Sequence, residues 1–547
     1  MAVTPNTDVY LLKCPLELDN ANQINFANTT AQFNYFYSLP KIECENFTYQ
    51  RKDSIIRFPA HIDSLLEYNY VMYRNTNYGN KWFYAFVTDM QYINDNMTAI
   101  TIKTDVWQTW CFGLSFKKSF VEREHVANDT IGLHTVPENI QYGDYICNNE
   151  YIYHAGSGSD GDMPVTKVYV CMQTTHDFGV SSTNEKIYNG VYQGAFVFAF
   201  KYNLSGLQDI QTVLMNLDAL GKGDTVVSLF LVPADIATWF TETIPLKDKD
   251  GNQTGTVTAY TPTASWTPKL MHLVGLDINT TINGYTPKNK KLFVAPYNYI
   301  QVSNHVGQGA EFNYEDFTNP LHVDFNVFGA FSQGCSIITT PQQYKKVSFN
   351  GIWNYVDYSV VCAKYPQLSW LSDYYLNWQA QNGVNLAVQA TQSAIQFGLS
   401  TAGIASGRNT EAGFSINNLL EDVTSIALQD RQAKLVPDNL KGNVSAGDVI
   451  YSMDQYGFSY RQMSIKAEYA KIVDSYFDVF GYKINETKVP QFTSRSNWNY
   501  VRTKGIVIES EMPQKDLQEI KDMFNAGVTM WHNPATFLDY SQSNNIV

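Results

Sequence analysis

Alternation of hydrophobic and polar residues runs through much of this chain, and this period-two pattern is typical of half-buried β-strands. In the first 120 residues, turn-rich segments separate four such runs. These predicted strands are Val9–Leu12, Tyr68–Tyr73, Trp82–Thr88 and Met97–Asp105. Trp107, Trp110 and Phe112 follow them and are predicted to form an aromatic core cluster. We therefore expect a β-rich domain over residues 1–120.

The next part mixes strand and helix patterns. Strands are predicted at Val165–Gln173, Gly194–Tyr202 and Thr225–Val232. Between the last two, an apolar stripe predicts a helix that ends near Gly221, and a short helix is predicted around Ala234–Phe240. The stripe consists of Leu207, Ile210, Val213, Leu214 and Leu217. The order indicates an α+β domain over residues 121–285.

Residues 286–375 return to an aromatic, strand-like pattern, and residues 451–547 are predicted to form a C-terminal α+β domain. Its first helix is expected at Met463–Phe480, with Ile465, Tyr469, Ile472 and Tyr476 on the buried face. Strands are expected around Trp498–Tyr500 and Ile506–Ile508. A last helix is expected at Pro513–Phe524, with Leu517, Ile520, Met523 and Phe524 facing inward. The polar tail from Asp539 is expected to be frayed.

Residues 376–450 differ from everything around them. From Tyr374 to Gly407 the chain has no charged residue and no histidine, although 16% of the whole chain is charged. Wound as a helix, the segment shows three groups of positions. An amide stripe comprises Gln381, Asn385, Gln389, Gln392 and Gln396. A stripe of small residues comprises Ala387, Ala390, Ala394 and Gly398, and Gly403 and Gly407 add a GxxxG spacing. Bulky apolar residues border them: Val384, Leu386, Val388, Ile395, Phe397, Leu399 and Ile404.

A second amphipathic helix is expected after Ser415, which can cap it, and Pro437 marks its end. Its apolar face includes Ile416, Leu419, Leu420 and Val423. Uncharged helices with small-residue stripes pack closely in lipid. The same pattern also fits a buried core helix or a packing helix in an oligomer. The sequence pattern leaves both interpretations open.

Composition and charge limit the classes of function that fit this chain. The 547 residues carry a net charge of −14, so the surface as a whole should repel nucleic acid. An acidic wall is still compatible with a conduit that must not bind its cargo. Seven scattered cysteines, an odd number with no CxxC pair, indicate neither a disulfide framework nor a zinc site. Met1–Leu16 lacks the pattern of a secretory signal, so we expect assembly in a reducing cytoplasm.

Candidate chemistry is sparse. His125 and His134 lie near Glu122, Glu124 and Asp129, where a metal or acid–base site is conceivable. Turn and capping roles for the neighbouring Asn128, Asp129 and Gly132 explain this segment better.

The segment Asp248–Asn252 begins like a calcium loop but lacks its glycine and its closing glutamate. A hairpin turn is the better interpretation there. We expect no catalytic residue, cofactor or metal.

Five segments spread over most of the chain carry a further signal. They are Lys81–Trp110, Phe120–Tyr145, Lys291–Tyr299, Tyr365–Asn382 and Ala467–Pro534, the last of which includes RSNWNY and GVTMWHNP. In sequence and in order, these segments resemble the tail knob (distal tail tube) proteins of phi29-type short-tailed bacteriophages. This resemblance implies a multidomain, mainly β protein with α+β parts, in which β-rich domains form a tube and a long apolar loop is inserted.

The resemblance further implies a homohexameric DNA conduit at the far end of the virion tail. Its apolar loops would plug the lumen and later penetrate the host cell membrane. Expected partners are other copies of the chain, other tail proteins (proximal tube or connector, and tip protein), the host membrane, and double-stranded DNA that passes without specific binding. Assembly is expected in the host cytoplasm. A cell-wall-degrading enzyme of the tail tip and a receptor-binding protein with a tyrosine-rich surface remain alternatives.

Overall fold

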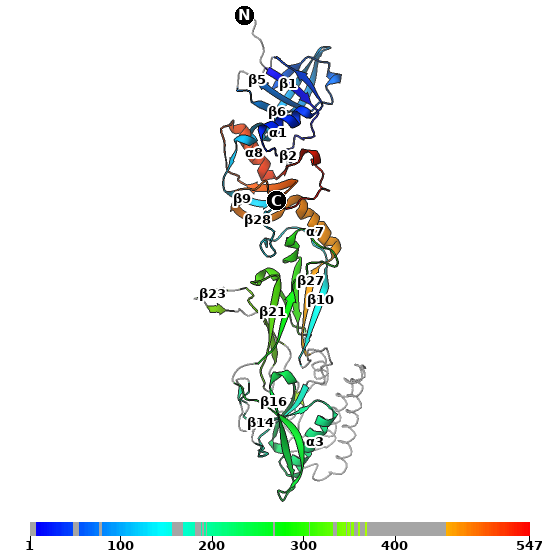
Figure 1. Ribbon diagram of the computed structural model, residues 1–547, viewed down its shortest axis with the longest axis vertical. Helices are drawn as coiled ribbons and strands as arrows, with labels where there is room; N and C mark the ends of the chain where they lie inside the picture. Colours follow the sequence, from blue (N-terminus) through cyan, green and yellow to red (C-terminus); the bar gives the residue numbers. More distant parts are fainter. Residues whose placement is uncertain are drawn as a thin grey trace, which may run out of the picture. The chain divides into compact units, whose positions relative to one another are not determined.

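The computed structural model describes residues 7–47, 54–75, 79–155, 168–180, 187–188, 191–192, 194–265, 269–305, 307–331, 336–345, 347–349, 352–354, 359–361, 367–368 and 456–547. The chain forms two compact units, each assembled from segments that are distant in sequence (Figure 1). Unit 1 comprises residues 1–145, 280–297 and 465–547, and unit 2 comprises residues 146–279 and 298–464. The five predicted domains, with divisions at 120, 285, 375 and 450, stay a prediction.

The first sheet of unit 1 is antiparallel, and helix α1 covers one of its faces (Figure 1). Its strands, in spatial order, are β3 (Lys41–Cys44), β1 (Thr7–Leu12), β5 (Tyr70–Asn75), β6 (Trp82–Asn94), β7 (Met97–Thr104) and β4 (Ile55–Phe58). Asn28 caps α1 (Thr29–Ser38), and Phe36 of this helix stacks on Tyr70 with ring centroids 5.4 Å apart. The four predicted strands of this region are confirmed. From Val9 to Leu12, strand β1 has no polar alternation because its two faces belong to two separate core clusters.

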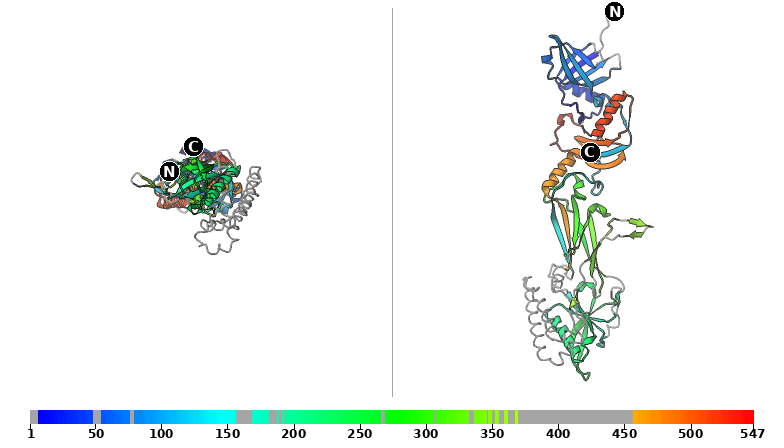
Figure 2. Two further views of the ribbon diagram at one scale, coloured as in Figure 1. Left: turned by 90° about the horizontal axis from the view of Figure 1, so that it is seen from below. Right: turned by 180° about the vertical axis from the view of Figure 1, so that it is seen from behind.

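The second sheet of unit 1 joins early and late parts of the chain. Its strands, in spatial order, are β2 (Asn22–Ile24), β31 (Val528–Trp531), β29 (Trp498–Lys504), β9 (Ser119–Glu124) and β28 (Tyr482–Lys488). Only the pair β2 and β31 is parallel among them. Helix α8 (Gln514–Ala526) lies beside these strands (Figure 2, right). The predicted inward face of α8 is confirmed, because its buried residues are Leu517, Ile520, Met523 and Phe524.

Helix α7 differs from its prediction in both start and buried face. It spans Ala467–Phe480, because Met463 and Ile465 belong to strand β27 (Gly457–Ile465). Its buried residues are Ala470, Val473, Asp474 and Phe477. Ile472, predicted to face inward, is 68% exposed. The helix stops at Gly481, which has a φ of +64°.

Unit 2 contains an α+β part, in which helix α3 packs on an antiparallel sheet. The strands, in spatial order, are β16 (Trp239–Lys247), β17 (Gln253–Pro262), β14 (Phe196–Lys201), β11 (Val168–Thr174), β15 (Val226–Pro233) and β26 (Gln367–Leu368). Helix α3 (Leu204–Ala219) ends just before Gly221, as predicted. The predicted helix at Ala234–Phe240 is wrong beyond its first turn. A single 3₁₀ turn, Ala234–Ile236, precedes β16, whose strand pairing with β17 takes over from Trp239 onward.

Two four-stranded antiparallel sheets form the other part of unit 2. The first contains β10 (Tyr145–His154), β27, β19 (Asn298–Ser303) and β20 (Gly309–Phe312). The second contains β18 (Lys269–Asp277), β21 (His322–Gly329), β22 (Ile337–Pro341) and β25 (Val360–Val361). Phe325 and Tyr460 meet between them with ring centroids 5.1 Å apart, and Thr339 Oγ1 lies 2.7 Å from Tyr460 Oη. Aromatic packing thus joins the two sheets.

Short strand pairs complete the fold. They are β12 (Ile187–Tyr188) with β13 (Val191–Tyr192), β23 (Val347–Phe349) with β24 (Ile352–Asn354), and β8 (Ser115–Phe116) with β30 (Ile508–Glu509). Of the predicted aromatic cluster, Trp107 is buried but Phe112 is 45% exposed. The predicted fraying from Asp539 is wrong at Asn544. This side chain is buried, accepts hydrogen bonds from Asn497 N and Trp498 N, and donates one to Trp498 O.

The fold is mainly β with helical parts, as expected. Five of the seven cysteines lie in the described part of the chain, and all five are free. Among the helices that the structure describes, none is both long enough and apolar enough to cross a membrane.

Candidate functional site

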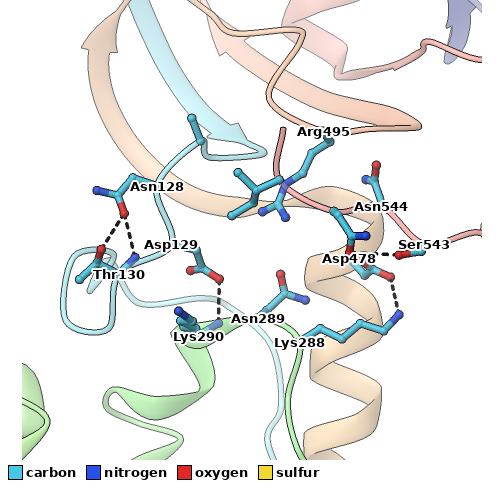
Figure 3. A pocket seen from close by; sticks show the side chains of 13 residues that line it. Asn128, Asp129, Thr130, Lys288, Asn289, Lys290, Asp478, Arg495, Ser543 and Asn544 are labelled. Atoms are coloured by element: carbon cyan, nitrogen blue, oxygen red, sulfur yellow. Dashed lines mark hydrogen bonds and ion pairs between the residues drawn. The ribbon is translucent and has the colours of Figure 1, made fainter.

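All site residues predicted from the sequence lie outside the described residues. They fall in the amide stripe, the small-residue stripe and the apolar positions between residues 381 and 423. Their expected role is therefore taken up as a proposal below. Within the described part of the chain, the candidate site is a polar pocket of about 610 Å³ in unit 1 (Figure 3).

Residues from five parts of the sequence build this pocket. They are residues 127–130, residues 288–290, Asp478, Arg495 and residues 543–546. Asn128 forms the predicted turn, because its Oδ1 accepts hydrogen bonds from Thr130 N and Thr130 Oγ1. Gly132 follows with a φ of +88°. The turn prediction is confirmed for these two residues, and it places Asp129 at the pocket wall.

Asp129 has a different role from the one predicted. Its carboxylate accepts hydrogen bonds from Lys290 N at 2.9 Å and from Tyr482 Oη at 2.8 Å. Burial raises the pKa of Asp129, while these two donors act in the opposite direction. The carboxylate thus fastens the 288–290 segment to strand β28.

Asp474 of α7 also holds this segment, together with the preceding Tyr285. Its carboxylate accepts hydrogen bonds from Tyr285 Oη, Lys288 N, Asn289 N and Asn289 Nδ2, at 2.6 to 2.9 Å. A buried carboxylate with this many donors is well solvated by the protein itself. Both aspartates therefore have structural partners, which hold the 288–290 segment in place.

Arg495 is the unusual member of the pocket. The residue is 9% exposed, and its buried Nε has no hydrogen-bond partner in the described part of the chain. Figure 3 shows its guanidinium extending into the space near Asp129, Asn289 and Asp478. Burial lowers the pKa of Arg495, but a guanidinium stays charged at neutral pH. Burying such a charge without a direct partner costs on the order of several kcal/mol.

The two histidines considered from the sequence do not form a metal site. His125 is buried and lies between Tyr500 N and Asp478 O, whereas His134 Nε2 lies 2.7 Å from Asn128 O. Among the described residues, no group of three or more histidines, cysteines or acids is arranged to hold a metal ion. Asp248 forms the predicted hairpin turn, since its Oδ1 accepts hydrogen bonds from Asp250 N and Asn252 N.

A second, wider depression lies in unit 2, with a volume of about 1110 Å³. It is lined mainly by the end of α3 and the β16–β17 turn, including Asp218, Lys222, Lys247 and Asp248. Burial raises the pKa of Asp218 to about 6. Acidic and basic residues both contribute to its lining, so it presents a mixed-charge surface.

Comparisons with known proteins agree with this architecture. Residues 5–115 match the family model of the caudoviral major tail protein N-terminus. The tail knob protein gp12 of bacteriophage C1 has a similar structure, with a TM-score of 0.63 over 99% of this chain and 100% of that one. The two sequences are 14% identical, so this likeness concerns the fold alone. Both the fold and the N-terminal segment are thus similar to those of tail proteins of tailed bacteriophages.

The family follows from the rest of the chain. Residues 262–545, more than half of the chain, match the C-terminal domain of the tail knob protein gp9 of Bacillus phage phi29. The tail knob protein gp9 of phage phi29 is 27% identical, over 97% of this chain and 98% of that protein. The corresponding protein of Bacillus phage PZA is 26% identical, with the same coverage. The chain belongs to the family of phi29-type tail knob proteins.

Proposed function

We propose that this tail knob protein is a structural, non-catalytic component that assembles into a homohexameric tube at the end of the phage tail. The observation that carries the proposal is the similarity to tail knob proteins along 97% of the chain. In the proposed ring each subunit uses two different surfaces, one toward each neighbour, as closed rings require. Other tail proteins would continue the tube on one side.

The charge of the chain supports a conduit function. With a net charge of −14 per chain, six copies would surround passing DNA with an excess of negative charge. A basic lumen would bind phosphates through counterion release and would slow the passage of DNA. We therefore propose that the tube conducts double-stranded DNA without binding it. Tight binding of the purified protein to linear duplex DNA at physiological salt would argue against this part.

We further propose that residues 376–450 form the lumen-plugging loop and that its core, residues 383–436, is active on membranes. As a helix, residues 383–405 would extend about 35 Å, enough to cross a hydrocarbon layer of about 30 Å. The lack of charge matters because one charged residue at the bilayer centre costs about 3 kcal/mol. The amide stripe would face water or other amides, and the small-residue stripe would allow close helix contacts.

The ring can be tested by its mass and its symmetry. Light scattering under reducing conditions should give six times the chain mass of 62.0 kDa, and negative-stain images should show a six-fold ring. A monomeric mass at micromolar concentration would contradict the proposed assembly. Because free cysteines are expected throughout, adding reductant should not change the measured mass.

The loop can be tested by leakage of dye from liposomes. Deleting residues 383–436, or combining Val388→Asp with Ile395→Asp, should leave the hexamer intact and abolish leakage under conditions that activate the native protein. The matched control combines Val388→Ile with Ile395→Val, which keeps both positions apolar and should keep leakage. If the deletion prevents ring assembly, or if the Asp variant leaks normally, the segment is a packing helix.

A further inference from the structure

We propose that the pocket lined by Arg495 in unit 1 binds a carboxylate group. This binding function goes beyond the tube and the membrane-active loop proposed above. The pocket opens to solvent and contains the buried guanidinium at its inner wall (Figure 3). A planar guanidinium matches a carboxylate well, because two parallel N–H groups can donate to its two oxygens.

Other buried cations of unit 1 show what Arg495 lacks. Lys291 Nζ lies 2.5 Å from Glu138 Oε1, and Arg123 pairs with the same carboxylate. By contrast, no ion pair joins Arg495 to Asp129 or Asp478 in the described part of the chain, although both acids attract it through space. In the described part of unit 1, Lys291 and Arg123 are thus paired, whereas Arg495 is directed into an open pocket.

The pocket walls are fixed before any ligand arrives. Asn545 O accepts a hydrogen bond from Ser496 N at 3.0 Å, and Val547 N donates one to Ser494 O at 3.1 Å. These bonds hold the C-terminal segment on both sides of Arg495. On the opposite wall, Asp129 holds Lys290 N. A preformed site loses little conformational entropy on binding.

The charges of the lining favour a carboxylate over phosphate. Three cations, Arg495, Lys288 and Lys290, face two acids, Asp129 and Asp478. Lys288 is already engaged, because its Nζ lies 3.1 Å from Asp478 Oδ2. The remaining excess is one positive charge, so a singly charged carboxylate neutralises it, whereas a doubly charged phosphate would leave an uncompensated negative charge in a partly buried site.

The carboxylate has two possible sources, a free organic acid or an acidic side chain of another polypeptide. Both present the same group to Arg495. A pocket of about 610 Å³ has room for more than one carboxylate, so it can also accept the backbone that carries an acidic side chain. Acetate and a capped Gly-Asp-Gly tripeptide distinguish these sources, because only the tripeptide contains a flanking backbone.

The experiment measures binding to the full-length protein at constant ionic strength. Acetate, the tripeptide and inorganic phosphate are titrated against a chloride background, and the arginine Nε–H signals are followed by NMR. The signal of Arg495 is assigned by its loss in Arg495→Gln. Lys290→Gln changes only an exposed side chain at the rim and tests the site without altering its core. The matched control is Arg502→Gln, since Arg502 is a half-exposed arginine of β29.

We expect saturable binding of acetate or the tripeptide with a shift of the Arg495 signal. Binding should weaken about tenfold or more in Arg495→Gln and several-fold in Lys290→Gln, and stay unchanged in Arg502→Gln. Tighter binding of the tripeptide than of acetate assigns the site to acidic side chains, and the reverse order assigns it to free acids. Absence of saturable binding, equal binding by Arg495→Gln, or tighter binding of phosphate than of either carboxylate would overturn the proposal.

Discussion

The free energy of unfolding of unit 1 should depend on pH most clearly through His125, whose buried ring is neutral. Tyr500 N donates a hydrogen bond to His125 Nδ1 at 2.7 Å, so Nδ1 must be unprotonated. The proton then resides on Nε2, which donates to Asp478 O at 3.0 Å. If Nδ1 were protonated, its N–H and the N–H of Tyr500 would point at each other in a buried site. Burial, followed by the positive charge of Arg495, lowers the pKa of His125 to about 3.

The size and sign of the effect follow from this pKa. In the unfolded chain the pKa is about 6.5, so between pH 6.5 and 3 the unfolded state binds the additional proton. Stability is therefore lost as the pH falls through this window. For His125 alone, the loss is about 2 kcal/mol between pH 7.5 and 5, and it approaches about 5 kcal/mol below pH 3.

Asp105 acts in the opposite direction. Burial raises its pKa to about 6, so the folded state binds a proton before the unfolded state does. Its contribution therefore decreases as the pH rises from about 4 to 6. The total stability of the chain would mix both effects. A difference between the native protein and a His125 variant removes the Asp105 contribution.

His125→Gln provides this comparison, because its amide can accept from Tyr500 N and donate to Asp478 O without titrating. Urea unfolding at pH 7.5, 6 and 5, followed by tryptophan fluorescence, should show a gap between the two proteins that narrows by about 2 kcal/mol toward pH 5. NMR of the His125 ring should show no titration above pH 5. Titration near pH 6.5, or parallel pH profiles, would refute the assignment of the neutral ring.

Two further substitutions test how α7 is held. At Gly481 an added Cβ would lie 2.3 Å from Glu124 O, whereas at Gly505, with a similar positive φ, it would meet nothing within 4 Å. Gly481→Ala should therefore lower the free energy of unfolding by clearly more than the about 1 kcal/mol expected for Gly505→Ala in urea denaturation, and equal losses would contradict the steric argument. Asp474→Ala should cost about 3 to 5 kcal/mol by leaving buried donors unpaired, against less than about 1 kcal/mol for the exposed Glu468→Ala on the same helix. A loss below 1 kcal/mol at Asp474 would show that water replaces the carboxylate.

The sequence predicted those helices and strands whose pattern of apolar residues is clear within the element itself. Four of the six strands of the first sheet, helix α3 and the buried face of α8 follow from apolar runs or periods that extend over enough residues to be recognised in the sequence. The predicted helix at Ala234–Phe240 failed because Trp239 and Phe240 join the long β16–β17 hairpin, whose partner strand lies further along the chain. Tertiary pairing here overrides a short helical pattern.

The candidate pocket was predictable only in part. The turn at Asn128 and Gly132 follows from residues that favour turns, and the sequence indicates it directly. Arg495 carries no comparable signal, because its distinguishing property is the lack of a partner. That property depends on segments around residues 129, 289 and 545, which come together only in the folded unit. A pattern of residues that are neighbours in sequence does not show that such a partner is missing.

Helix α7 shows the physical reason for the largest error. It has apolar residues on two faces, and the prediction chose the face with Ile465, Tyr469, Ile472 and Tyr476. The true buried face contains Asp474, whose charge is balanced by donors from residues 285–289, about 190 positions earlier in the chain. Burying a carboxylate is favourable only when such donors are supplied. The buried face of a helix with two apolar faces can therefore be predicted only when the segment that donates hydrogen bonds to its polar residue is known. Here that segment includes Lys288 and Asn289, which also line the Arg495 pocket.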